Sequence, residues 1–160
     1  MTIRKELESK ILAKLRALVG NIATVSGLLE SVAAGSAKEI AKGRPEVRVT
    51  VAPAQAGGWG KPEVEFSVKV NVRLDLEDDV SQASFDAVCE PIENLIESWQ
   101  LDRNWREVSD DLGISRFRID GFRADGGRDS VSFTASDPYL STDFAFALQG
   151  VLRNQKKEES

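Results

Sequence analysis

The stretch Val64–Leu76, which reads VEFSVKVNVRLDL, places an apolar residue at every second position. Side chains of a β-strand point alternately to opposite faces, so this pattern predicts one strand with a buried face and a wet face. At ~3.3 Å per residue the stretch extends over roughly 43 Å, about twice the length of a typical strand. We therefore expect a strand that reaches beyond the body of a small domain.

The segments around and before this strand have regular patterns of their own. Glu46–Ala52 alternates as a shorter strand, and the glycine-rich Pro53–Lys61 links the two strands as a β-hairpin with a long tip. Thr2–Val19 repeats apolar residues at three- and four-residue steps, which predicts an amphipathic helix capped by Thr2. Val25–Ala33 continues a weaker helical rhythm, so we expect a second helix there.

The second half of the chain predicts helices followed by strands. Phe85–Trp99 forms one apolar stripe whose phase continues through Pro91, which favours one kinked helix over two separate helices. A further helical rhythm runs from Leu101 to Leu112 and closes at Gly113. Alternation then predicts strands at Ser115–Arg123, Val131–Phe133 and Tyr139–Gly150.

The order of these elements predicts the fold class. Links of hairpin length make the sheet mostly antiparallel, with amphipathic helices packed on its apolar face. We expect a single two-layer α+β domain over residues 1–150 with a long extended β-hairpin, followed by a polar C-terminal tail at 151–160. The polar face of the sheet could face water or line the lumen of an assembly.

The composition excludes several kinds of catalytic and metal site. The chain has no histidine, the commonest general base and transition-metal ligand, so Ser-His-Asp, Cys-His and His-rich zinc sites are ruled out. Its single cysteine, Cys89, lies on the apolar stripe of a predicted helix, where an inert buried thiol is expected. We predict no enzymatic activity, no catalytic residue, no cofactor and no required metal.

The glycine-rich loop around Trp59 favours a contact site over a nucleotide site. A phosphate loop needs glycine where the chain has Gln55, and Lys61 is followed by Pro62 instead of serine or threonine. A tryptophan at an exposed hairpin tip can anchor a partner, and the loop could equally fold back and bury it against its own domain. The predicted interface residues are Trp59, Lys61, Lys69 and Arg73.

Two charged motifs have simple structural explanations. Glu77–Asp79 lacks the spacing of a calcium loop and is better explained by helix capping. Arg116, Arg118 and Arg123 suggest a nucleic-acid platform, but the net charge of −5 argues against that function. We expect no sequence-specific nucleic-acid binding. No apolar run approaches the ~18–20 residues of a membrane span, so no membrane association is expected either.

Charge is unevenly distributed along the chain. Residues 1–44 hold eight Lys/Arg and four Asp/Glu, a net charge of +4. Residues 77–112 hold two Arg and eleven Asp/Glu, a net charge of −9. This asymmetry suggests complementary surfaces between neighbouring copies, although two solvated helix faces would give the same pattern.

Taken together, these elements resemble the tail terminator and tail-completion proteins that form rings in the necks and tails of tailed bacteriophages. The resemblance rests on the N-terminal helix, the Val47–Val51 and Val64–Leu76 strands, the Phe85–Trp99 helix and the Tyr139–Gly150 strand. It implies a homo-oligomeric ring, a structural virion protein made in the host cytoplasm, that joins the tail tube to the head connector. The alternative is a cytosolic, acidic, dimeric secretion-type chaperone or adaptor, which such a mix of helices and antiparallel sheet also resembles.

Overall fold

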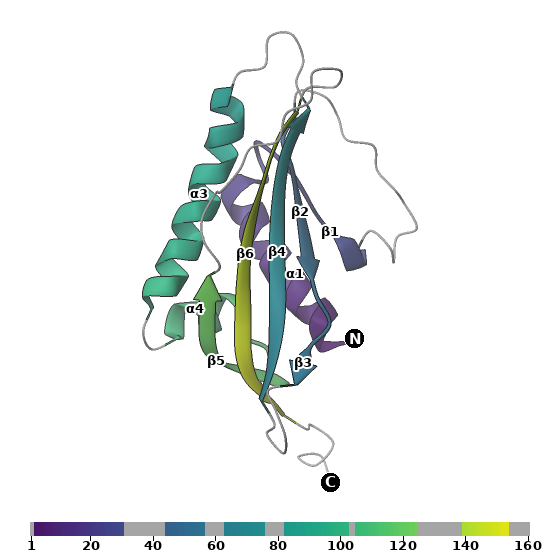
Figure 1. The fold of residues 1–160 in the computed structure, drawn as a ribbon, viewed down its shortest axis with the longest axis vertical. Coiled ribbons are helices and arrows are strands. Elements are labelled where there is room, and N and C mark those ends of the chain that lie inside the picture. The colour runs from purple at the N-terminus through teal and green to yellow at the C-terminus, as the bar shows by residue number, and fades with distance from the viewer. Residues whose placement is uncertain are drawn as a thin grey trace.

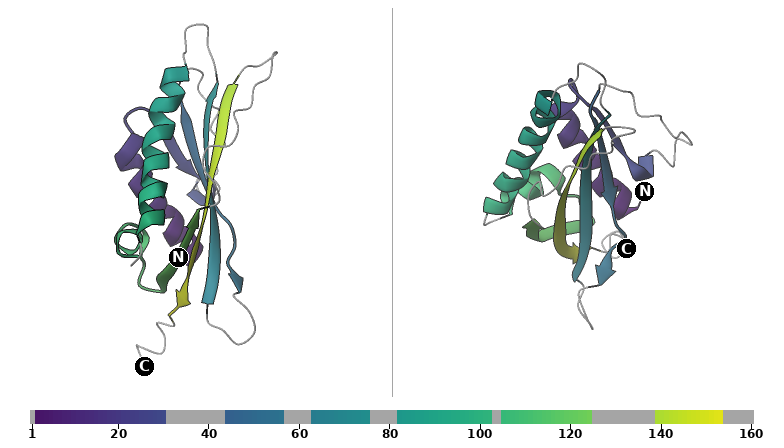
Figure 2. Two further views of the ribbon diagram at one scale, coloured as in Figure 1. Left: turned by 60° about the vertical axis from the view of Figure 1, so that its left-hand side comes forward. Right: turned by 45° about the horizontal axis from the view of Figure 1, so that its top comes forward.

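The computed structural model describes residues 2–30, 44–56, 63–75, 82–102, 105–124 and 139–153. Its helices are α1 (Ile3–Val19), α3 (Gln82–Leu101) and α4 (Arg106–Leu112). Its strands are β1 (Thr24–Gly27), β2 (Glu46–Val51), β3 (Gln55–Ala56), β4 (Glu63–Asp75), β5 (Phe117–Ala124) and β6 (Tyr139–Leu152). The strands form one sheet in the order β1-β2-β4-β6-β5, with β3 paired to β4, and the helices lie on one face of it (Figure 1 and Figure 2). The predicted two-layer, mostly antiparallel α+β fold is confirmed.

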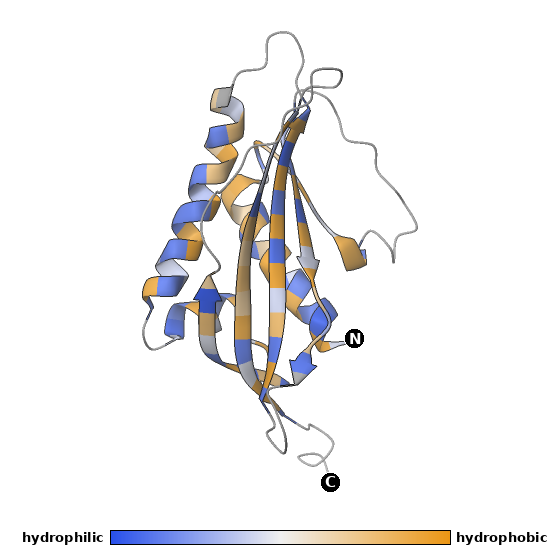
Figure 3. Cartoon of the chain, viewed as in Figure 1, coloured by the Kyte–Doolittle hydropathy of each residue, from blue (hydrophilic) through white to orange (hydrophobic). Residues whose placement is uncertain are grey.

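Strand β4 is the central strand of the sheet, and β6 pairs with it along its whole length. The antiparallel register runs from Glu63 opposite Val151 to Asp75 opposite Tyr139. Apolar and polar bands alternate along β4 in Figure 3. The apolar side chains from Phe66 to Leu74 are each at most 3% exposed, because they point toward the helices.

The long predicted strand is therefore confirmed as one continuous element, with its last residue, Leu76, outside the described residues. The expectation that it reaches beyond the body of the domain is wrong. Strand β6 is equally long and lies beside all of β4, so the length of β4 is used inside the sheet.

The two arms of the predicted hairpin pair as expected. Strand β2 runs antiparallel to β4, from Glu46 opposite Arg73 to Val51 opposite Val68. Strand β3 extends this contact toward the tip, where Gln55 lies opposite Glu65. The rest of the tip lies outside the described residues.

Helices α1 and α3 cover the apolar face, as the sequence pattern predicts. Helix α1, capped by the Thr2 hydroxyl as predicted, packs on β1 and β2, and α3 packs on β4, β5 and β6. Helix α3 continues through Pro91, in agreement with the prediction of a single helix. Beneath it, the rings of Trp99, Phe122 and Phe146 contact one another with centroids 5.4–6.0 Å apart.

The segment predicted as a second helix begins as a strand instead. Strand β1 pairs in parallel with β2, from Thr24 opposite Glu46 to Gly27 opposite Val49. Helical structure starts only at residues 28–30, and residues 31–43 lie outside the described part of the chain. The β-branched Thr24 and Val25 suit a strand, and pairing with β2 overrides the weak helical periodicity.

A buried carboxylate marks the point where β1 ends. Glu8 of α1 is 1% exposed, and its carboxylate oxygens accept the backbone N–H groups of Leu29 and Glu30, each at 2.9 Å. Glu8 thereby caps the helical turn at residues 28–30 from a different element. A Cβ at Gly27 would lie 2.3 Å from Glu8 Oε1, so a glycine leaves the room that this carboxylate needs.

The predicted helix from Leu101 to Leu112 is shorter than expected. Leu101 ends α3, and α4 begins at Arg106 after Trp105, which has a left-handed backbone with φ of 56°. The Asp102 carboxylate caps α4 by accepting the N–H of Glu107 at 2.7 Å. Helix α4 ends at Gly113, as predicted.

The C-terminal strands agree with the sequence pattern at their centres. Strand β5 pairs with β6, which continues to Leu152, two residues past the expected end of both the strand and the domain. The predicted strand at Val131–Phe133 and the tail from residue 154 lie outside the described residues.

We predict that Val70→Asp destabilises the fold by more than ~3 kcal/mol, because it places an unpaired charge at a position that is 1% exposed. Urea unfolding of the purified variant measures this loss. Ser67→Asp is the matched control, since it introduces the same charge on the exposed face of the same strand and should cost about 1 kcal/mol or less. Equal losses in the two variants would refute the facing of β4.

We also predict that Gly27→Ala destabilises the fold through Glu8. The added methyl group displaces a carboxylate that holds two backbone N–H groups, so the substitution should cost about 1–3 kcal/mol. In a Glu8→Ala background the same substitution should cost at least ~0.5 kcal/mol less, because the clashing atom is gone. A double-mutant cycle by urea unfolding tests this coupling, and strictly additive effects would contradict it.

Candidate interaction surfaces

The polar face of the sheet, opposite the helices, carries four charge pairs in the described residues, two within a strand and two between strands. They are Arg48 with Glu46, Lys69 with Asp143, Arg73 with Asp75, and Arg123 with Glu65, at nitrogen–oxygen distances of 3.0, 3.5, 2.7 and 3.3 Å. Strands β2, β4, β5 and β6 all contribute. Because every cation in this set has a carboxylate partner, the set carries no net charge and favours neither an anionic nor a cationic ligand.

Asn71 joins β4 to β6 in the middle of this face. Its side-chain amide donates to Ser141 Oγ at 3.0 Å and to Asp143 Oδ1 at 2.8 Å. Together with three charged neighbours it lines a hollow of about 90 Å³: Glu46, Arg48 and Arg73. A space of this size holds a few water molecules, since one water occupies ~30 Å³, and it is too small for an organic substrate.

Two of the four predicted interface residues lie on this polar face, as expected. Lys69 is paired with Asp143, and the guanidinium of Arg73 lies over the Tyr139 ring, 4.2 Å from its centroid. Trp59 and Lys61 lie outside the described residues, so the structure gives positions for only two of the four predicted interface residues.

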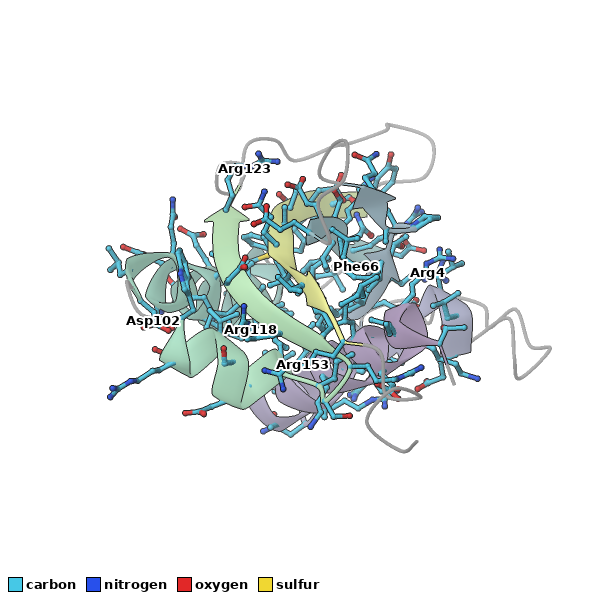
Figure 4. All side chains as sticks on the ribbon, turned by 90° about the horizontal axis from the view of Figure 1, so that it is seen from below. Arg4, Phe66, Asp102, Arg118, Arg123 and Arg153 are labelled. Atoms are coloured by element: carbon cyan, nitrogen blue, oxygen red, sulfur yellow. The ribbon has the colours of Figure 1, made fainter. Side chains whose placement is uncertain are left out.

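A second surface, here called the basic end, lies where α1 begins and β6 ends. It contains a hollow of about 400 Å³ between α1 and the turn after α4, lined by Glu6, Ser9, Lys10, Gly113, Ile114 and Ser115. Arg116 pairs with Glu6 at 2.9 Å at this end. Figure 4, which views the molecule from below, shows Arg118 and Arg153 on this side.

Several cations of the basic end remain available for a partner. Lys10, Arg118 and Arg153 are exposed and form no ion pair with another residue that the structure describes. The carboxylate of Glu6, by contrast, is already engaged by Arg116. The hollow of the basic end is therefore bordered by Lys10, a cation without a carboxylate partner among the described residues.

The outer side of α3 and α4, here called the acidic face, has the opposite charge. Helix α3 contains no lysine or arginine, and Glu90, Glu93 and Glu97 are exposed at three- and four-residue steps. Glu107 and Asp110 of α4 add exposed carboxylates. Like charges at these spacings destabilise an isolated helix slightly. Because α3 has no cation of its own, nothing within the helix compensates this row of carboxylates.

Part of the predicted charge complementarity is satisfied inside one copy. The Asp111 carboxylate of α4 accepts the indole N–H of Trp99 at 2.8 Å and lies 3.2 Å from Lys14 Nζ of α1. One carboxylate thereby connects three helices and pairs the buried polar atom of Trp99. The +4 and −9 segments thus meet within the helix layer as well as exposing charge outside it.

The described residues contain little that suggests catalysis. Cys89 is buried in α3, as predicted. No group of three potential Asp, Glu, Cys or His ligands is close enough to hold a metal ion in the described ranges, and Glu77–Asp79 lies outside them. No helix in the described part of the chain is long and apolar enough to cross a membrane.

Comparison with protein-family models gives no match, and comparison with curated proteins gives no significant match. The function is therefore argued from the sequence pattern and from these surfaces. The basic end was missed by reasoning from the sequence, because its residues come from segments about a hundred positions apart.

We predict that Lys69→Ala changes the free energy of unfolding by less than ~1 kcal/mol, because both partners of its ion pair are about half exposed. Arg73→Ala should cost more, about 1–2 kcal/mol, since Arg73 also stacks on Tyr139 and its partner Asp75 is only 14% exposed. Urea unfolding of both variants measures the order, and a larger loss for Lys69→Ala would contradict it.

Proposed function

We propose that this chain is a structural subunit of a tailed bacteriophage, a tail terminator or neck protein that assembles into a ring. In this role it joins the tail tube to the head connector, is made in the host cytoplasm and becomes part of the virion. The elements on which the resemblance rests, α1, β2, β4, α3 and β6, follow one another in a single sheet-and-helix unit, which supports the proposal.

The observation that carries the proposal is the pair of oppositely charged surfaces on one fold. The acidic face and the basic end are different parts of the same molecule, and contact between different surfaces arranges copies head to tail. Such contacts close into a ring when the rotation between neighbours allows it. Opposite charge orients neighbours in this way, because a twofold contact through either surface alone would bring like charges together.

Charge alone does not hold such a ring together. An exposed ion pair contributes about 0–1 kcal/mol, so apolar contacts or strand pairing between copies must supply most of the affinity. The length of β4 does not add to the argument, because β6 covers it within the chain. The polar face of the sheet, with its four charge pairs, is compatible with either a lumen or a solvent-facing wall.

The test is the mass and symmetry of the purified chain. Light scattering at increasing protein concentration should show a closed oligomer larger than a dimer, and negative-stain images should show rotational symmetry above twofold. Raising the salt concentration should weaken the assembly, because screening reduces attraction between exposed charges. A salt-insensitive twofold dimer that binds an unfolded client segment would contradict the proposal and favour a chaperone.

A further inference from the structure

We infer that Leu101 of one copy docks into the hollow at the basic end of the next copy. This inference rests on the proposed ring and names the two surfaces that make its repeated contact. The occupant of the hollow is thus a second copy of this chain, and the ligand is the end of helix α3.

The hollow has the size and the lining for an apolar side chain with charged neighbours. Its volume of about 400 Å³ exceeds that of one leucine side chain and leaves room for part of the helix end. Ile114 supplies an apolar surface in the lining, and Lys10 supplies a cation with no carboxylate partner among the described residues. Its one lining carboxylate, Glu6, is already paired with Arg116, so the free charge of the hollow is positive.

Leu101 is the most exposed large apolar side chain among the described residues. It is 72% exposed, whereas the other exposed large apolar side chains, Ile22, Leu28 and Leu152, are 39–48% exposed. A single exposed leucine is common on protein surfaces, so its exposure alone does not indicate a contact site. The evidence for a contact is its position, because Leu101 lies one helical turn after Glu97, at the end of the acidic stripe of α3.

The chemistry of the two surfaces is complementary. Leu101 with Glu97 offers an apolar side chain, the knob, beside a carboxylate, and the hollow offers Ile114 beside the ammonium of Lys10; neither charge has an ion-pair partner among the described residues. Leucine burial contributes to the affinity, and the Glu97–Lys10 attraction across the contact sets its orientation.

Leu101 and the hollow are different surfaces of one chain, since Leu101 is not among the lining residues. Figure 4 shows Asp102, the neighbour of Leu101, at one side of the molecule, and the hollow is lined by residues of α1 and of the turn after α4. A contact between two copies through these surfaces leaves one Leu101 and one hollow unused. This arrangement extends from copy to copy until a ring closes.

The experiment uses three exposed substitutions in the full chain and measures assembly by sedimentation velocity and negative-stain imaging. Leu101→Ser removes the knob, Ser9→Trp fills the hollow, and Leu28→Ser is the matched control on an exposed leucine outside the contact. Circular dichroism melting confirms that each variant remains folded. We expect the first two variants to weaken association at least tenfold and the control to assemble like the wild-type chain.

Mixing the two deficient variants tests the head-to-tail geometry. A Leu101→Ser copy keeps its hollow and a Ser9→Trp copy keeps its knob, so an equimolar mixture should form pairs of one copy each and nothing larger. Reversing one charge pair gives a second check: Lys10→Glu should weaken association, and Glu97→Lys in the same chain should restore it in part.

The outcomes separate this inference from the proposed function. If rings form equally well with Leu101→Ser and Ser9→Trp, the inference is wrong and the ring remains. If the wild-type chain forms only a twofold dimer, both the ring and this contact are wrong. If the equimolar mixture contains no pairs of one Leu101→Ser copy with one Ser9→Trp copy, although both variants are folded, the contact is not made by Leu101 and the hollow.

Discussion

The pairing of β4 with β6 is the constraint on which the rest of this structure depends. Their side chains alternate with period two, so a slip of one residue would turn Phe66 and Val70 outward and expose the charged row on the other face to the helices. The full-length register excludes that slip. It also places Phe144 and Phe146 beneath α3, which gives the helix a large aromatic surface to cover. One side of the sheet thereby becomes the core, and the other side must remain polar.

The helix layer is held in place by carboxylates that work across elements. Glu8 of α1 caps the turn after β1, Asp102 caps α4, and Asp111 of α4 joins Trp99 of α3 to Lys14 of α1. Each of these groups satisfies backbone or indole N–H groups that would otherwise be unpaired at a helix end or in the core. These carboxylates are used internally, whereas the exposed carboxylates of α3 are left without a lysine or arginine in that helix, and Lys10 borders the hollow where α1 begins.

This distribution of exposed charge is the feature of the molecule that suggests contact between copies. The polar face of the sheet balances its charges locally, and its small hollow suits water. The larger hollow is bordered by Lys10, which has no carboxylate partner among the described residues, and the exposed Leu101 is not part of its lining. A protein with two unlike, complementary surfaces can assemble head to tail.

The sequence by itself determined the features that depend on local periodicity. Alternation in Val64–Leu76 and in Tyr139–Gly150, the stripe through Pro91 and the capping of α1 by Thr2 were all predictable, as were the burial of Cys89 and the outward position of Lys69 and Arg73. Only the tertiary structure decided which strands pair and which distant residues meet. Thr24–Gly27 forms a strand parallel to β2, because hydrogen bonding with β2 outweighs its weak helical periodicity. The tertiary structure also places Gly27 against the carboxylate of Glu8, nineteen positions away. It also formed the hollow from α1 and the turn after α4 and left Leu101 uncovered. These features depend on contacts between segments far apart in the chain, and no local pattern of polar and apolar residues encodes such contacts.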